Sequence, residues 1–251
     1  KAAPTDPAPK QEAPDAKQEA PKPEVKRANR IQHIERPGAP RKPLENFREA
    51  TKLDFKPVAQ GELSRFNEMR RGSIPVGREH IKQVAQADVY RMTETAEALN
   101  LSRLRENIIQ NIRNAKDGQG TPNVPFIRAY KEFVAQFVAD LFPNSLLVEV
   151  NAVLVVNEMM DGIEDIEAPV KLILKLLADP EQKQAILYLL MDGLSKAKTV
   201  RLISVQDETD AAALLLQIAA RPDQQELLQE KIVVTLGVLG RAFSGRLPEQ
   251  A

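Results

Sequence analysis

Two stretches in the second half of the chain share one order of residue types: LADPEQKQAILYLL (Leu177–Leu190) and AARPDQQELLQEKI (Ala219–Ile232). Each begins with the end of an apolar helical pattern. A proline beside an aspartate comes next, and Glu and Gln residues then precede a second apolar pattern. A proline in the first turn of a helix loses no backbone hydrogen bond, and it disfavours helical backbone in the residue before it. The stretch therefore predicts a joint between two helices, with Asp179 as N-cap and Pro180 at the first helical position.

Three helical hairpins are predicted around such joints, over residues 125–160, 165–196 and 209–243. Their turn prolines, Pro143, Pro180 and Pro222, are 37 and 42 residues apart. That spacing is close to the period of two-helix solenoid repeats of the HEAT or armadillo kind. Apolar residues recur every three or four positions from Ile127 to Leu141, which indicates one face of an α-helix. The following stretch, 146–160, is apolar nearly all round, so we expect a central, buried helix.

The fold class predicted for the whole is all-α. The hairpins form either an irregular bundle or a short HEAT/armadillo-like α-solenoid, because both arrangements account for the pattern. Two further helical segments, ending near Leu99 and Gly118, precede the hairpins. The stretch TVRLISV (199–205) alternates weakly, and we expect an extended connector there.

The chain divides into regions of unlike composition. The first 45 residues hold nine of the 18 prolines and only four large apolar residues. Such a segment cannot bury enough surface to offset its ordering entropy. We expect an extended Pro-Ala-Lys-Glu tail at 1–43, a linker at 44–78, a helical domain at 79–246 and a short C-terminal tail at 247–251.

The linker carries short amphipathic pieces that are too short to be stable alone. In one interpretation it packs back on its own domain. In the other it holds linear motifs whose anchors enter the grooves of a partner. The candidate anchors are Phe47, Phe55, Phe66 and Met69.

The inventory of reactive side chains argues against most enzyme classes. Cysteine and tryptophan are absent, and the two histidines, His33 and His80, precede the predicted hairpins. This removes thiol nucleophiles, Ser–His pairs and most transition-metal sites. No glycine pattern matches a phosphate or dinucleotide loop. We expect no catalytic residue, no cofactor and no metal, although chemistry by carboxylates alone stays open.

Charged clusters are the remaining candidate sites. The sequence DGIEDIE contains Asp161, Glu164, Asp165 and Glu167. Three interpretations stay open for it: a solvated loop near a helix N-terminus, an acidic docking patch, and a metal site. Basic residues form a second set, for which three interpretations stay open: they keep the tail soluble, they contact an acidic protein surface, or they contact nucleic-acid phosphates. These residues are Arg27, Arg30, Arg41, Lys42, Arg70 and Arg71.

The last predicted helix is apolar over more of its surface than one neighbouring helix covers. We expect docking or self-association through it. The candidate docking residues are Leu228, Ile232, Leu236, Leu239 and Phe243. The sequence GVLG (Gly237–Gly240) within this helix predicts a point of close helix packing.

The functional expectation is a non-enzymatic structural subunit of a larger assembly. Its helical domain docks, and its tail tethers other protein subunits. The alternative is a nucleic-acid-associated structural protein, viral or ribosomal in type, with a phosphate-contacting tail. The balance of 35 acidic and 35 basic residues gives no global field toward either partner. No apolar run is long enough for membrane insertion. The first residue is Lys1 rather than Met, which predicts a removed leader or a shortened chain and leaves organelle, periplasm and virion open as locations.

Overall fold

The computed structural model describes residues 50–160, 166–199, 203–222 and 224–240. Within these ranges the chain forms nine α-helices and two short 3-10 helices and no β-strand, which confirms the all-α prediction. The α-helices are α1 (Gln60–Arg70), α2 (Arg78–Tyr90), α3 (Leu101–Arg113), α4 (Val124–Ala139), α5 (Leu146–Glu158), α6 (Glu167–Leu177), α7 (Gln184–Thr199), α8 (Val205–Ala219) and α9 (Glu226–Gly240). The 3-10 helices are η1 (Arg91–Thr93) and η2 (Thr95–Glu97). The predicted tails at 1–43 and 247–251 lie outside the described residues.

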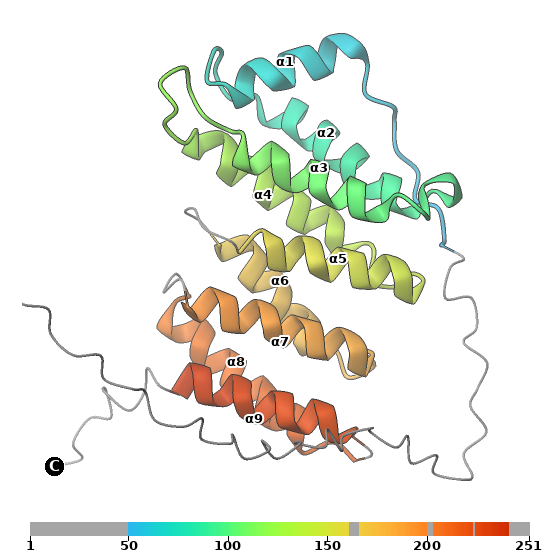
Figure 1. Cartoon of the computed structure of the whole chain (residues 1–251), viewed down its shortest axis with the longest axis vertical. Helices are drawn as coiled ribbons and strands as arrows, with labels where there is room; N and C mark the ends of the chain where they lie inside the picture. The colour runs from blue at the N-terminus through green and yellow to red at the C-terminus, as the bar shows by residue number, and fades with distance from the viewer. Residues whose placement is uncertain (1–49, 161–165, 200–202, 223, 241–251) are drawn as a thin grey trace, which may run out of the picture. The chain divides into compact units, whose positions relative to one another are not determined.

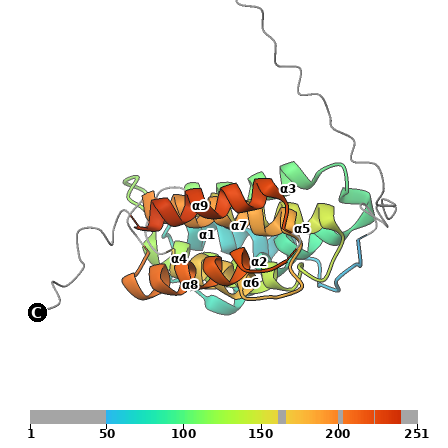
Figure 2. The same cartoon turned by 90° about the horizontal axis from the view of Figure 1, so that it is seen from below.

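The helices from α2 to α9 pair as hairpins that stack in two layers (Figure 1). Helices α2, α4, α6 and α8 pack in sequence along one layer, and α3, α5, α7 and α9 pack along the other. Figure 2 shows these two sets on opposite sides of the stack. Each hairpin packs mainly on its neighbours in the chain, which is the packing of a short solenoid. Of the two arrangements left open by the sequence, the contacts follow the stacked one.

A continuous apolar core fills the space between the layers. Helix α5 is its most apolar member, as predicted: Val148, Ala152, Val155 and Val156 are all almost completely buried. Aromatic side chains concentrate near the first hairpins, where Phe126 and Tyr130 of α4 are fully buried. Burying a large side chain of this kind stabilises the fold by roughly 1.5–3 kcal/mol.

The turn prolines do not take the predicted position at the start of a helix. Helices α5, α7 and α9 begin three or four residues after Pro143, Pro180 and Pro222. In the second joint, Asp179 caps its own turn instead of a helix, because its Oδ1 accepts the backbone N–H of Glu181 at 2.9 Å. The prolines still separate the two helices of each hairpin, but they do so from within the turn.

The connector before α8 is shorter than predicted. Helix α7 runs to Thr199 and α8 begins at Val205, so only Ile203 and Ser204 of the described residues lie between them. Helix α8 begins at Val205, four residues before the predicted start at 209. Its start has a local cause, because Ser204 Oγ accepts the backbone N–H of Asp207 at 3.1 Å. This is an N-cap, which supplies a partner to a backbone donor that would otherwise have none.

The segment before α2 belongs to the same unit as the helices. Helix α1 packs on α2 and α4, and the chain from 50 to 59 runs extended from the start of α1 past the ends of the first helices (Figure 1). We call residues 50–59 the strap. Its side chains Leu53, Phe55 and Val58 are partly buried against the core. The described part of the predicted linker therefore packs back on its own domain, which is the first of the two interpretations, and it completes the N-terminal end of the helical stack.

Candidate interaction surfaces

The strap is fixed to the stack by hydrogen bonds between its backbone and side chains of the stack. The backbone N–H of Thr51 donates to Asn144 Oδ1 at 3.0 Å, and Asn144 Nδ2 donates to the carbonyl of Thr51 at 2.8 Å. Farther along, the N–H of Leu53 donates to Thr93 Oγ1 at 3.0 Å. Thr93 is fully buried, so this bond reaches into the protein. The strap thereby spans from the turn between α4 and α5 to η1 and then to α1.

Two of the predicted anchor residues hold α1 in place rather than face a partner. Phe66 is 2 % exposed and Met69 is 1 % exposed. The Phe66 ring lies edge-on to Phe126 and Tyr130, with centroids 5.1 and 5.6 Å apart. An amphipathic helix of this length gains its stability from such packing. Neither side chain is available to a partner in this structure.

The other predicted tail and linker residues are divided between the core, the surface and the undescribed chain. Phe55 is partly buried against the core. Arg71 is exposed, whereas the adjacent Arg70 is partly buried and donates from Nη1 to Asn111 Oδ1 at 3.0 Å. The structure thus splits this basic pair. The remaining members lie outside the described residues: Phe47, Arg27, Arg30, Arg41 and Lys42.

The repeated turns contact one another along one edge of the stack. Lys183, just before α7, pairs with Glu149 of α5 at 2.5 Å and also donates to the carbonyl of Asn144 at 3.4 Å. In the next turn, Arg221 donates to the carbonyls of Pro180 and Asp179 at 3.2 and 3.4 Å. Each of these turns thus contacts the turn before it. Burial raises the pKa of Glu149, while the hydrogen bond and charge of Lys183 oppose that rise.

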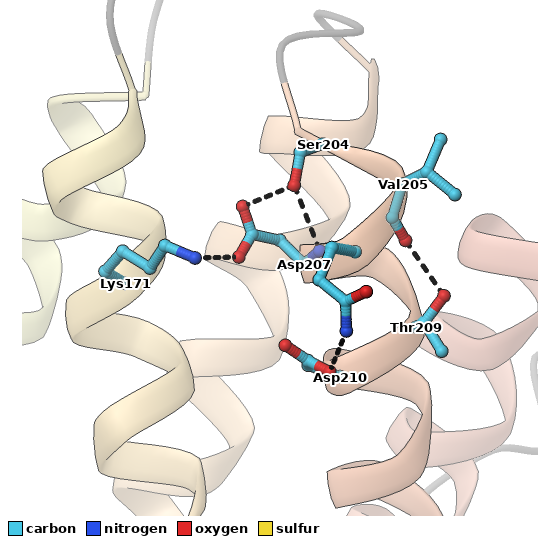
Figure 3. A network of polar contacts seen from close by, with 7 residues as sticks. Lys171, Ser204, Val205, Asp207, Thr209 and Asp210 are labelled. Atoms are coloured by element: carbon cyan, nitrogen blue, oxygen red, sulfur yellow. Dashed lines mark hydrogen bonds and ion pairs between the residues drawn. The ribbon is translucent and has the colours of Figure 1, made fainter.

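Charged side chains also join successive helices within each layer. Lys171 of α6 pairs with Asp207 of α8 at 2.6 Å, and the second carboxylate oxygen of Asp207 accepts from Ser204 at 2.7 Å (Figure 3). In the other layer, Lys231 of α9 pairs with Asp192 of α7, and its ammonium lies 5.0 Å from the ring centre of Tyr188. Both contacts help to fix the register of the α8–α9 hairpin on the α6–α7 hairpin.

The acidic cluster is described only at its end. Glu167 is exposed at the start of α6 and lines an open groove together with Arg128, Lys131, Glu132 and Lys171. Its predicted companions Asp161, Glu164 and Asp165 lie outside the described residues. Among the described residues, no group of three or more His, Asp and Glu side chains is placed to hold a metal ion. The groove mixes both signs of charge, which suits contacts with another protein surface better than binding of a single ion.

A polar network that the sequence analysis missed lies beneath α1. Tyr130 donates to Asp88 Oδ2 at 2.6 Å, and Asn111 Nδ2 donates to the same oxygen at 3.2 Å. Arg70 of α1 binds the other end of the Asn111 amide. Desolvation raises the pKa of Asp88 from 3.8 to about 6, although the Tyr130 hydrogen bond opposes the rise. The spacing of these residues in the sequence carries no signal, because four different helices contribute them.

The predicted docking residues of the last helix face inward. Leu228, Ile232 and Leu239 are at most 2 % exposed, and Leu236 is partly buried against the core. Phe243 lies outside the described residues. The helix instead exposes its opposite face, on which Leu227, Val233 and Val234 are more than half exposed. Both faces of α9 are apolar, so the apolar pattern within this helix does not by itself indicate which face packs on the core.

The last hairpin presents the largest set of exposed apolar side chains in the described part of the chain. Val205 and Leu216 of α8 are 55 % and 60 % exposed, and they join the three residues of α9. The predicted close-packing point at Gly237–Gly240 is wrong within the described chain, because a Cβ built at either glycine meets no atom within 4 Å. We call the outward side of α8 and α9 the end face.

The described helices were compared with the requirements of a membrane span, and the chain was compared with known proteins. In the ranges that the structure describes, no helix has the length and apolar character needed to cross a bilayer. The chain matches no protein-family model, no curated protein and no solved structure.

Proposed function

We propose that this protein is a non-enzymatic tethering subunit of a larger protein assembly. The helical stack is the anchor, and the proline-rich segment 1–43 binds other subunits. The strap is the observation that carries the proposal. Thr51 is bound in both directions to Asn144, and Leu53 is bound to the buried Thr93, so the chain that follows this segment has a fixed position on the stack.

Tethering works by raising effective concentration. A weak linear motif held near its target by a folded anchor binds as if it were present at about millimolar concentration. The anchor must keep its geometry for this gain to persist. The bridges between successive hairpins, such as Lys183 with Glu149 and Lys171 with Asp207, support that requirement.

The alternative is a nucleic-acid-associated protein. It is favoured by the basic residues Arg27, Arg30, Arg41 and Lys42 in the N-terminal segment. Phosphate contacts made by such residues are blind to sequence and weaken steeply as salt rises. Protein contacts made by a proline-rich segment depend on the order of its residues and respond less to salt. These properties separate the two functions experimentally.

The test is affinity capture from an extract of the organism that makes the protein. Three proteins are compared: the full chain, a variant lacking residues 1–43, and a variant with residues 1–43 shuffled at constant composition. Each is eluted over a salt series, with and without nuclease. We expect a defined set of proteins to bind the full chain and to be lost from both variants, unaffected by nuclease.

Two outcomes contradict the tether. Equal capture by the shuffled variant means that composition alone binds. Loss of the captured proteins on treatment with nuclease or at moderate salt would support nucleic-acid binding instead. Circular dichroism and thermal unfolding of the shortened variant provide the control, and both should match those of the full chain because the deletion leaves all described residues, which begin at residue 50, intact.

A further inference from the structure

The end face is the position at which a further hairpin would stack. The turn prolines Pro180 and Pro222 set a register of 42 residues between the last two hairpins. With this register, α7 and α9 begin at equivalent positions, Gln184 and Glu226, and α6 and α8 end at equivalent positions, Leu177 and Ala219. The two hairpins can therefore be compared residue by residue.

The inward positions of the two hairpins agree. Ile186 and Leu190 of α7 are fully buried, and their equivalents in α9, Leu228 and Ile232, are at most 2 % exposed. This agreement shows that the register holds in space as well as in sequence. The packing partners agree as well, because α9 packs on α7 and α8 on α6 as α7 packs on α5 and α6 on α4.

The outward positions differ. Leu174 of α6 and Met191 of α7 are 8 % and 0 % exposed, and the α8–α9 hairpin stacks on the hairpin that contains them. Their equivalents Leu216 and Val233 are 60 % and 69 % exposed in the last hairpin. At these two positions the end face keeps the apolar chemistry of a stacking surface, but no described segment covers them.

The opposite end of the stack does not provide a matching surface. Helix α1 covers it, and the residues that α1 exposes are mostly polar, including Ser64, Arg65 and Glu68. Its only large exposed apolar residue is Leu63, at 36 %. Head-to-tail stacking of two copies would place a polar surface on an apolar one. A pairing of end face with end face buries the apolar side chains of both copies at once, and it closes without forming a filament.

The charges of α9 fit an antiparallel pairing of two copies. The exposed carboxylates Glu226 and Glu230 lie in the first half of the helix. The second half, through Gly237 and Gly240, carries no charged residue, and at both glycines a Cβ would meet open space. In an antiparallel crossing the acidic half of one helix lies across the uncharged half of the other, so like charges stay apart.

From these observations we propose that the end face of α8 and α9 binds the end face of a second copy of this chain about a two-fold axis. The proposal is independent of the tethering function, because a monomer can tether and a dimer can lack binding partners. If both hold, each assembly carries two N-terminal segments, and its avidity for repeated partners rises.

Sedimentation velocity on the full chain, from about 1 to about 100 μM, tests the association. We expect a monomer–dimer equilibrium. The Leu216→Glu and Val234→Glu variants should each weaken it about tenfold or more, because each buries a charge at the centre of the contact. The Leu99→Glu variant is the matched control, since Leu99 is 92 % exposed and lies away from the end face. Unchanged circular dichroism in all three variants shows that the fold is retained.

Cross-linking tests the symmetry. The chain has no native cysteine, so a single introduced thiol gives an unambiguous product. With a short bismaleimide, Val234→Cys should yield a cross-linked dimer by itself, whereas Ser64→Cys on α1 should not. A product formed only when the two variants are mixed identifies head-to-tail stacking and overturns the proposal. A wild-type chain that stays monomeric throughout the concentration range overturns it as well.

Discussion

The two ends of the described helical stack are built differently. At the N-terminal end, α1 and the strap cover the first hairpin, bury Phe66 and Met69, and turn polar residues to solvent. At the C-terminal end, α8 and α9 bury one side and leave Val205, Leu216 and Val233 exposed on the other. A stack of repeats needs a polar cap wherever it meets water. Within the described chain, the N-terminal end therefore carries a polar cap, whereas the C-terminal end exposes apolar side chains.

The largest expected effect comes from breaking the N-terminal cap. The Phe66→Ala variant should lose about 3–5 kcal/mol of stability, because it removes a fully buried ring that packs on two others. The Leu227→Ala variant makes a smaller truncation at the other end, where the side chain is 68 % exposed, and it should change stability by less than about 0.5 kcal/mol. Urea unfolding followed by circular dichroism, at protein concentrations too low for association, measures both. Equal losses would mean that the two ends do not differ as described.

A second pair of variants compares an internal contact with the end face. In Gly193→Ala, the new methyl group would collide with Asn157 Oδ1 and would lie 2.6 Å from Ile173 Cδ1. We expect a loss of about 3 kcal/mol, since the helices must move apart. In Gly237→Ala the methyl group meets open space, and alanine favours the helix by about 1 kcal/mol. At protein concentrations too low for association, the same substitution should therefore lower the thermal midpoint at Gly193 and raise it at Gly237. A loss at Gly237 would show that this face is already covered.

A third test uses the acidic network beneath the cap. Asp88 holds its proton up to about pH 6 in the folded protein, compared with 3.8 as its ordinary value. The folded state therefore binds more protons than the unfolded state between these values, and the stabilising contribution is lost as pH rises through about 6. The difference corresponds to at most about 3 kcal/mol, and we expect about 2 because the residue keeps some contact with water.

The Asp88→Asn variant should abolish this decline while keeping an acceptor for Tyr130. The measurement is the free energy of unfolding of the variant and the wild type from pH 4 to pH 7. Their difference should shift in favour of the variant as pH rises. Glu68→Gln, on the exposed side of α1, is the control and should follow the wild type. A constant difference between Asp88→Asn and wild type across the series would contradict the assigned proton.

The smallest effect concerns the strap. The Asn144→Ala variant loses the paired hydrogen bonds to Thr51 and should cost about 1 kcal/mol. Its effect should be local, so hydrogen exchange of the strap amides should accelerate while that of α8 and α9 stays unchanged. Asn114→Ala, which removes an exposed side-chain contact with Gln110, is the matched control. Faster exchange throughout the protein would indicate that the strap is part of the global fold rather than a local clasp.

The helices and their pairing were predictable because their signals are local. The apolar spacing from Ile127 to Leu141 and the uniform apolarity of α5 depend only on nearby residues, and both predictions are confirmed. The place of α1 was not predictable in the same way. It is short, and its stability comes from Phe126 and Tyr130, which lie about 60 residues farther along the chain.

The orientation of α9 is indicated by the sequence register between the last two hairpins. The 42-residue register aligns Leu228 and Ile232 with Ile186 and Leu190, so the inward face of one hairpin indicates that of the next. The placement of the turn prolines failed for a different reason. An aspartate can either cap a helix or close its own turn by accepting a backbone N–H, and the residue type alone does not determine which of the two occurs. In this structure Asp179 closes its own turn.

The strap also determines how the molecule carries mechanical load. A force applied at the N-terminal end passes from Thr51 directly into Asn144, and thus bypasses the ninety-odd residues between them. Those residues stay shielded until this clasp breaks. Among the described residues, the later hairpins pack mainly on their neighbours, so tension between the ends should separate them one after another, beginning with α8 and α9. In an optical trap we expect stepwise extension from the C-terminal hairpins first. The shielding should disappear in Asn144→Ala, and unfolding of the whole stack in a single step would contradict this picture.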